Sequence, residues 1–177
     1  PDCSACISIR IPLASFKFKK SYRRTLKKLN HWELSVEKPT MDLYPIYERY
    51  VSERHSDGSM FPPSPKQFED FLITGYEESR FLVAREEGKP VACLVFDPLE
   101  DGLSSVYCFF DPDKSADSPG SFMILQICKL ALALGLPFHY LGYWVANSPK
   151  MEYKTRFQPL QYFINGQWKD SFPAVEL

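Results

Sequence analysis

Hydrophobic and polar residues alternate with different periods along the chain, and each period predicts a different element. Ile7, Ile9 and Ile11 alternate with polar residues, which predicts a short strand that Pro12 closes. Residues 21–29 follow a helical period, with a serine as the expected N-cap and basic side chains over most of the surface.

Proline and glycine mark the ends of the longer helices. A helix is predicted over about 43–54, with Pro45 in its first turn, where proline is tolerated. The residues from 119 to Leu134 are apolar nearly all round, which predicts a buried helix that ends at Gly135. A serine followed by a proline at the first helical position opens this helix and predicts two others; the three pairs are Ser64-Pro65, Ser118-Pro119 and Ser148-Pro149.

Strand-like runs occupy the intervals between these helices. They are 81–85, 91–96, 103–110, 138–143 and 161–164. Turn residues at 86–89 and at Asp101-Gly102 connect the first three as hairpins.

This order predicts an α/β (α+β sandwich) fold with a mixed sheet and a buried central helix. It fits the GNAT-like acyltransferase fold, in which strands diverge beside that helix and leave a cleft for an acyl donor. A generic α+β domain without a cleft fits the same order. We expect a basic N-terminal segment over 1–38 and a GNAT-like transferase domain over 39–177.

Charge is distributed unevenly over the 177 residues. The chain has 21 basic and 22 acidic side chains, yet residues 1–30 carry a net charge of +7 and the remainder −8. The eight basic residues of the first segment are Arg10, Lys17, Lys19, Lys20, Arg23, Arg24, Lys27 and Lys28. A basic segment on an acidic body is typical of a polyanion binder, although a solvated surface explains the charge as well.

Cysteine usage favours a reducing, cytoplasmic setting. Cys93, Cys108 and Cys128 lie in apolar runs, which is typical of free thiols. Cys3 and Cys6 form half of a four-ligand metal site, so we expect no bound metal and no cofactor. Because the chain begins with proline, we expect it to be the C-terminal part of a longer protein. No apolar run approaches the ~18 residues of a membrane span.

Motifs spread over the whole chain carry a resemblance to one family. They are Cys3-Ser-Ala-Cys6, Arg10-Ile-Pro12, Ser21–Lys28, Tyr47, Tyr50, Arg54-His55, Asp101–Tyr107, Phe110–Pro112, Gly135–Pro137, Tyr140–Trp144, Lys150–Lys154, Phe157, Pro159 and Trp168. Together they resemble the bacterial aminoacyl-tRNA–protein transferases, the aspartate/glutamate leucyltransferase branch related to the arginyltransferases. The resemblance implies transfer of an amino acid, leucine rather than arginine, from aminoacyl-tRNA to the N-terminal Asp or Glu of a protein, which marks it for degradation. Ala116 and Asp117 stand where the family has an arginine, and Ser148 where a cysteine is frequent.

Attack of an amine on an aminoacyl ester requires a tRNA site and a cation for the acceptor carboxylate. The predicted tRNA-binding residues are Arg23, Arg24, Lys27 and Lys28, which can follow a phosphate backbone. For the acceptor we expect Arg54 with His55, and Lys154 as the alternative. A helix-terminal cation facing the helix dipole explains Arg54 equally.

The reaction also needs groups for the proton and the oxyanion. The candidates are Tyr107, Asp111 and Tyr143, which with Tyr153 lie at strand ends or a helix start. The two strand tyrosines fit the core as well, and Asp111-Pro112 fits a turn. His139, in an apolar strand, is expected in the core.

Two other functions fit the fold. One is an acetyl-CoA-dependent N-acetyltransferase, and the other is a non-catalytic tRNA-binding module. The loop 111–121 argues against acetyl-CoA, because it has three acids and one glycine where a diphosphate needs free backbone amides.

Overall fold

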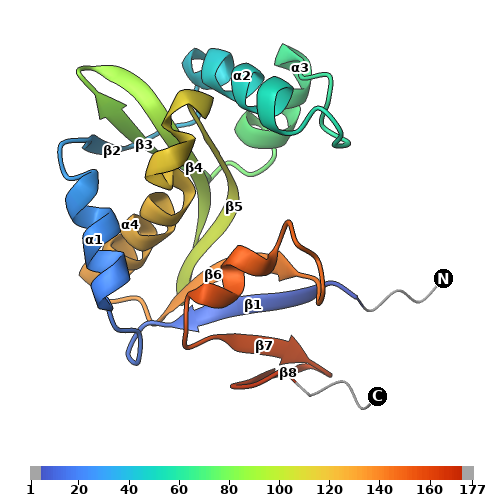
Figure 1. Ribbon diagram of the computed structural model, residues 1–177. Helices are drawn as coiled ribbons and strands as arrows, with labels where there is room; N and C mark the ends of the chain where they lie inside the picture. Colours follow the sequence, from blue (N-terminus) through green and yellow to red (C-terminus); the bar gives the residue numbers. More distant parts are fainter. Residues whose placement is uncertain (1–4, 173–177) are drawn as a thin grey trace.

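Eight strands pair into one mixed sheet in the order β2-β3-β4-β5-β6-β1-β7-β8. The computed structural model describes residues 5–172 (Figure 1). The strands are β1 Ile7–Pro12, β2 Glu33–Glu37, β3 Arg80–Glu86, β4 Lys89–Leu99, β5 Gly102–Phe110, β6 Phe138–Trp144, β7 Gln161–Ile164 and β8 Gln167–Lys169. The helices are α1 Lys20–Lys28, α2 Tyr44–Arg54, α3 Pro65–Phe68 and α4 Pro119–Ala133, with short turns η1 Met41–Leu43, η2 Glu69–Ile73, η3 Pro112–Asp117 and η4 Glu152–Arg156.

Helices cover both faces of the central strands. The Phe68 ring of α3 packs against Phe81 of β3. Leu82, which follows Phe81 in the same strand, lines a groove with Leu130 of α4. Because successive side chains of a strand point to opposite faces, α3 and α4 lie on opposite sides of the sheet. Most of α4 is buried, as its apolar sequence predicts. No helix of residues 5–172 is long and apolar enough to cross a bilayer.

The N-terminal strand lies inside the sheet. β1 pairs antiparallel with β6 on one side and with β7 on the other, and β2 pairs with β3. The boundary expected between residues 38 and 39 therefore separates two stretches of sequence that both contribute strands to this sheet.

The sheet divides between β5 and β6. These parallel strands pair only from Gly102 with Phe138 to Ser104 with Tyr140, although both run on for several residues. A Cβ on Gly102 would lie 2.5 Å from the Phe138 carbonyl oxygen, so only glycine allows the two strands to approach this closely where their pairing begins. The register with the outer neighbours shifts at Val95/Phe96 on one side and at Ile9/Arg10 on the other. Such irregularities bend strands and help β5 and β6 to diverge.

Several helix starts differ from the sequence pattern. Ser64 caps α3 as predicted, since its Oγ accepts the Gln67 amide at 3.1 Å. Ser21 lies inside α1, because the extended Lys19 is the N-cap. Ser118 adopts a left-handed conformation and its side chain does not cap α4, because its amide ends η3 by donating to Ser115. The helix predicted from Ser148-Pro149 is the short 3-10 turn η4.

Candidate active site

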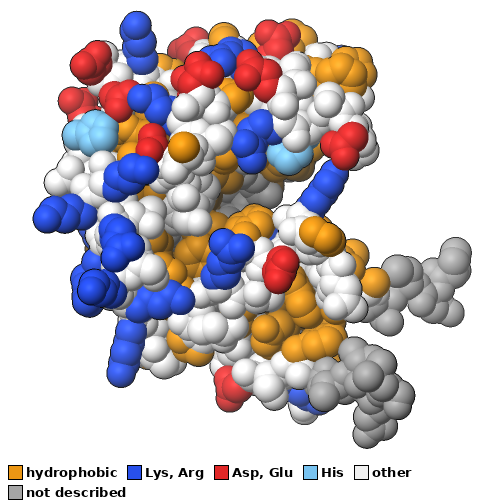
Figure 2. Space-filling view, in the orientation of Figure 1, with side chains coloured by type: hydrophobic (Ala, Val, Ile, Leu, Met, Phe, Trp, Pro, Cys, Tyr) orange, Lys and Arg blue, Asp and Glu red, His pale blue; other side chains and the backbone are white. Residues whose placement is uncertain are grey.

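A cavity of about 550 Å³ opens where the sheet divides. Figure 2 shows the surface hollowed between the part that carries α2 and the segment that follows β6. The walls of this cavity come from the end of α2 and the residues that follow it, the end of β5, η3, the start of α4, and the segment that leads into η4. The residues that line it are Tyr50, Arg54, His55, Asp57, Cys108, Phe110, Ser115, Ser118, Pro119, Gly120, Ser121, Ile124, Lys150 and Tyr153.

Arg54, the last residue of α2, places a guanidinium at this cavity. Its Nη1 donates to Ser115 Oγ at 2.8 Å, and its Cζ lies 5.3 Å from the centre of the Phe110 ring. Ser115 in turn donates to the Pro112 carbonyl oxygen at 2.5 Å. One nitrogen is thereby held by η3, and the remaining N–H groups of the planar fork can bind a carboxylate.

His55 caps α2 and is half-buried beside the cavity. Its backbone amide donates to Val51, and its ring lies 5.0 Å from the Tyr50 ring. Burial, followed by the charges of Arg54 and Lys150, lowers the pKa of His55 from 6.5. The imidazole is therefore neutral near pH 7 and can accept a proton.

Lys150 adds a third basic group that the sequence reasoning did not single out. Its Nζ lies 3.1 Å from an Asp57 carboxylate oxygen, and both side chains are largely exposed. An exposed pair of this kind is weak, so Lys150 can exchange Asp57 for an incoming carboxylate. Its place in the Lys150–Lys154 motif was the available signal, but only the fold brings it to the end of α2.

The cavity thiol and phenol are protonated. Burial raises the pKa of Cys108 and of Tyr153 to about 12 each. Cys108 is therefore a poor nucleophile, because the thiolate is the reactive form. Tyr153 keeps its proton and can donate a hydrogen bond.

The three predicted catalytic residues do not meet at the cavity. The Tyr107 ring packs 6.1 Å from Tyr47 and 5.9 Å from Phe71, and burial raises its pKa. Asp111 accepts a hydrogen bond from Arg49 Nη1 at 3.1 Å and caps η3. The Tyr143 side chain is 60% exposed on β6. None of the three lines the cavity.

Lys154 has a different position from the one expected for acceptor binding. Its Nζ donates to the carbonyl oxygens of Leu141 at 2.8 Å and Tyr143 at 2.6 Å. These oxygens lie along β6 beyond its last pair with β5. Lys154 thus supplies hydrogen-bond donors to carbonyl oxygens of β6 in the part of the strand that no longer pairs with β5. Burial lowers the pKa of Lys154.

The predicted tRNA-binding residues lie on α1, where Figure 2 shows Lys and Arg side chains gathered. Arg23 donates to the Phe18 carbonyl oxygen at 2.8 Å, and Lys28 pairs with Asp117 at 2.6 Å. Arg24 and Lys27 are exposed. The helix therefore presents a basic surface, although Lys28 is already paired.

The acids of the loop before α4 are also paired. Arg49 contacts Asp111 at 3.1 Å and Asp113 at 3.3 Å, while Lys28 binds Asp117. These ion pairs weaken the charge repulsion expected for a diphosphate. The backbone amides of this loop are also occupied, because the N–H groups of Asp113, Lys114 and Ser118 all donate within η3 and are not free to bind a diphosphate.

The predicted half-site for a metal lies partly outside the described residues. Cys3 lies outside the described residues, whereas Cys6 lies within them and is exposed. Within residues 5–172, no three His, Cys, Asp or Glu side chains gather in a way that could hold a metal ion.

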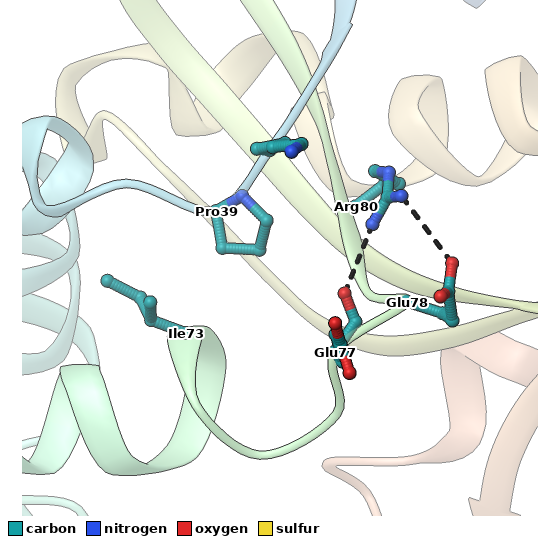
Figure 3. Close-up of a pocket in the computed structure, with 6 residues that line it drawn as sticks. Pro39, Ile73, Glu77, Glu78 and Arg80 are labelled. Atoms are coloured by element: carbon teal, nitrogen blue, oxygen red, sulfur yellow. Dashed lines mark hydrogen bonds and ion pairs between the residues drawn. The ribbon is translucent and has the colours of Figure 1, made fainter.

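A separate hollow of about 320 Å³ lies beside Pro39 and Ile73 (Figure 3). Arg80 closes one side of it by donating to the Glu77 carbonyl oxygen at 3.3 Å and pairing with Glu78 at 3.5 Å. Arg80 is thus engaged by its own neighbours, and we assign this hollow no chemistry.

The divided sheet, the buried α4 and the cavity between them define the GNAT-like class of acyltransferase folds. The GCN5-related glucosamine N-acetyltransferase region of a fungal multi-domain β-N-acetylglucosaminidase has a TM-score of 0.57 and 11% identity, covering 91% of this chain and 20% of its own. L-PGS from Bacillus licheniformis has a TM-score of 0.57 and 15% identity, covering 82% of this chain and 47% of its own. The predicted fold class is confirmed.

Residues 42–164 match the family described as arginine-tRNA-protein transferase, C terminus, and the chain belongs to this family. An aspartate/glutamate leucyltransferase of Acinetobacter baumannii is 40% identical over 170 residues, 94% of this chain and 63% of that protein. One from Pseudomonas fluorescens is 40% identical over 169 residues, 94% of this chain and 72% of the relative. The predicted family is confirmed, and the chain spans 63% of the length of the Acinetobacter relative.

Proposed function

We propose that this chain carries the site that transfers leucine from leucyl-tRNA to the N-terminal Asp or Glu of a protein, in the cytoplasm. The observation that carries the proposal is the group of basic side chains, Arg54, His55 and Lys150, that line the cavity. The names of the relatives support leucine as the transferred amino acid.

The acceptor carboxylate fits the Arg54 end of the cavity. Arg54 offers a fork whose orientation Ser115 fixes, and Lys150 offers a mobile ammonium beside it. Asp57 is the acid that lines the cavity, and Lys150 neutralises it. An acidic N-terminal side chain is therefore attracted, and a basic one is repelled.

His55 suits the role of proton acceptor. A free α-amine has a pKa of about 7.7–8.0, so much of the acceptor is protonated at pH 7. His55 takes that proton, and the amine nitrogen then bonds to the ester carbonyl carbon. The C–O bond to the ribose breaks, and the ribose oxygen leaves as a hydroxyl group with the second proton that the attacking nitrogen loses. These transfers leave a peptide bond and deacylated tRNA.

Tyr153 suits the stabilisation of the oxyanion that forms during this attack. Tyr153 lines the same cavity, and because its pKa is raised to about 12, its hydroxyl stays protonated and can donate to the oxyanion. Tyr153 and His55 thus replace Tyr107, Asp111 and Tyr143 as the groups proposed for catalysis.

A transfer assay with labelled leucyl- and arginyl-tRNA tests the proposal. The acceptors are peptides that begin with Asp, Glu, Asn or Lys and are otherwise identical. We expect transfer of leucine to the Asp and Glu peptides and at least tenfold less to the Asn peptide, which has the same shape without the charge. Equal transfer to Asn, or saturable acetyl-CoA binding at micromolar concentration with acetylation of the peptide, would overturn it.

A further inference from the structure

A second cavity, of about 470 Å³, lies between α1 and the end of η4. Ser118 and Ser121, at the start of α4, line both this cavity and the one that holds Arg54. The two cavities therefore adjoin at these serines, and the cavity beside the basic helix, called the groove below, lies next to the candidate active site.

The α1 wall of this cavity is a single helical face. Ser21 and Thr25 line it, and Lys28 follows on the same face one turn later, because residues four and three apart are neighbours on a helix. Lys20, Arg24 and Lys27 are also spaced in this way on an adjacent, exposed face. A chain of phosphates that follows the exposed cations can thus enter the groove at its edge.

The chemistry of the lining fits a polar, anionic ligand. Besides its hydroxyl groups, the cavity presents Lys19, Arg156 and the amide of Gln158, and no acidic residue lines it. Arg156, which lines the cavity, is exposed to solvent. Cations with hydroxyl and amide groups suit the phosphate, ribose and base edge of an unpaired nucleotide.

Aromatic stacking makes this groove a fixed feature. The Tyr22 ring stacks between Phe16 and Phe157, with centroids 5.7 Å from each and both interplanar angles 16°. The Tyr22 hydroxyl donates to the Arg156 carbonyl oxygen, and Lys19 Nζ contacts the same oxygen at 3.4 Å. These contacts hold α1 against the opposite wall, so the groove needs no large rearrangement to receive a ligand.

We propose that the groove between α1 and residues 155–158 holds the unpaired 3′-terminal nucleotides of tRNA and delivers the aminoacyl ester to the active site at Ser118 and Ser121. This assignment rests on the proposed function. The volume is in the range of sites for small organic ligands and admits single-stranded ends rather than a duplex. The two substrates then enter from opposite ends, tRNA past α1 and the acceptor past Arg54.

The test compares intact leucine-specific tRNA with the same tRNA lacking its unpaired 3′ nucleotides, by fluorescence anisotropy. The wild-type protein should bind the intact tRNA at least tenfold more tightly. Ser21→Glu and, separately, Thr25→Glu place an anion in the groove, and each should reduce this preference to less than threefold. Asn30→Glu is the matched control, because it makes the same charge change at an exposed residue outside the groove. The control should keep the tenfold preference.

Each outcome has a defined meaning. If the wild-type protein binds both tRNAs equally, or if both groove variants keep the preference, the groove does not hold the 3′ end. If binding behaves as expected but leucine is not transferred to Asp peptides, the proposed function fails while the RNA groove stands. Leucine transfer by the wild-type protein, with an unchanged KM for leucyl-tRNA in both groove variants, overturns the groove alone.

Discussion

Arg54 Nη1 donates a hydrogen bond to Ser115 Oγ across the cavity, at 2.8 Å. The contact joins the end of α2 to the turn that precedes α4, and it orients the guanidinium above Phe110.

Removal of the Arg54 guanidinium should abolish the preference for acidic acceptors. Arg54→Ala should lower kcat/KM for Asp peptides by about 10- to 100-fold, the equivalent of about 1.5–3 kcal/mol for a charge-assisted bond. The Asn peptide should be nearly unaffected. Ser115→Ala, which releases the guanidinium and also removes the bond from Ser115 Oγ to the Pro112 carbonyl oxygen, should have a smaller effect in the same direction. Normal kinetics of Arg54→Ala with Asp peptides would transfer the role to Lys150.

The pH profile of single-turnover transfer should report His55. Since its pKa lies below 6.5, wild-type activity should persist below the pKa of the free amine and fall only when His55 is protonated. In His55→Gln the rate should instead follow the unassisted amine, rising about tenfold per pH unit up to about pH 7.8.

Charged neighbours of His55 should shift, in opposite directions, the pH at which activity falls on the acid side of this profile (its acid limb). Asp57 raises the pKa of His55, whereas Arg54 and Lys150 lower it, and the nearby Tyr50 is uncharged at these pH values. Asp57→Asn should therefore extend activity to lower pH, and Lys150→Met should shift the limb upward. Profiles that stay fixed in both variants would remove His55 from the proton transfer.

His139 should make stability depend on pH. It is fully buried, with Ser105 Oγ 2.7 Å from Nε2 and Cys128 Sγ 3.2 Å from Nδ1, and burial lowers its pKa from 6.5 to about 3. Between these values the unfolded chain binds a proton that the folded chain does not. Its contribution to stability is therefore complete above pH 6.5 and is lost as the pH falls toward 3, by at most about 1.4 kcal/mol per pH unit. Urea unfolding across this range should show a shallower slope for His139→Gln, and identical slopes would contradict the assignment.

Lys154 should stabilise the divided sheet. In Lys154→Met the carbonyl oxygens of Leu141 and Tyr143 lose their donor, so the free energy of unfolding should fall by about 1–3 kcal/mol. Lys154→Arg keeps a donor and should lose less. Denaturant unfolding of both variants measures the difference, and equal stability of Lys154→Met and wild type would show that water replaces the ammonium.

Exposed cations of α1 should determine the salt dependence of tRNA binding. Reversal of Arg24 and Lys27 together should weaken binding and reduce the slope of log K against log salt by about two. Lys28→Glu is a useful comparison, because Lys28 already pairs with Asp117 and contributes less to phosphate binding. An unchanged slope in the double variant would exclude α1 from the tRNA surface.

Local signals explain which parts of the fold could be predicted from sequence. Ser64-Pro65 and the apolar residues after Ser118-Pro119 predicted α3 and α4, and Gly88 marked the turn between β3 and β4. Ser118 shows the limit, since its left-handed backbone comes from the preceding turn and not from a cap. The place of β1 between β6 and β7 depends on long-range pairing, which no local period encodes.

The candidate site could be predicted only in part, for a similar reason. Arg54 and His55 stood out because the acceptor carboxylate requires a cation, and a basic pair at the predicted end of a helix can supply it. Ser115, Lys150 and Tyr153 come from two other segments, and only the folded chain brings them to the same cavity. Asp111 shows the same limit, because an acid after a strand fits both a catalytic group and a cap; in the structure it binds Arg49 and the Asp113 amide.

The position of β1 affects the order in which the fold can be completed on the ribosome. β3, β4 and β5 pair with near neighbours in sequence and can form hairpins as they emerge. β1 is synthesised before the other seven strands, yet its partners β6 and β7 are synthesised after the buried helix α4. Its isoleucines therefore remain without their partners through most of translation. A pause before residue 138 leaves a nascent chain with half of its sheet and an apolar strand open to chaperones and proteases.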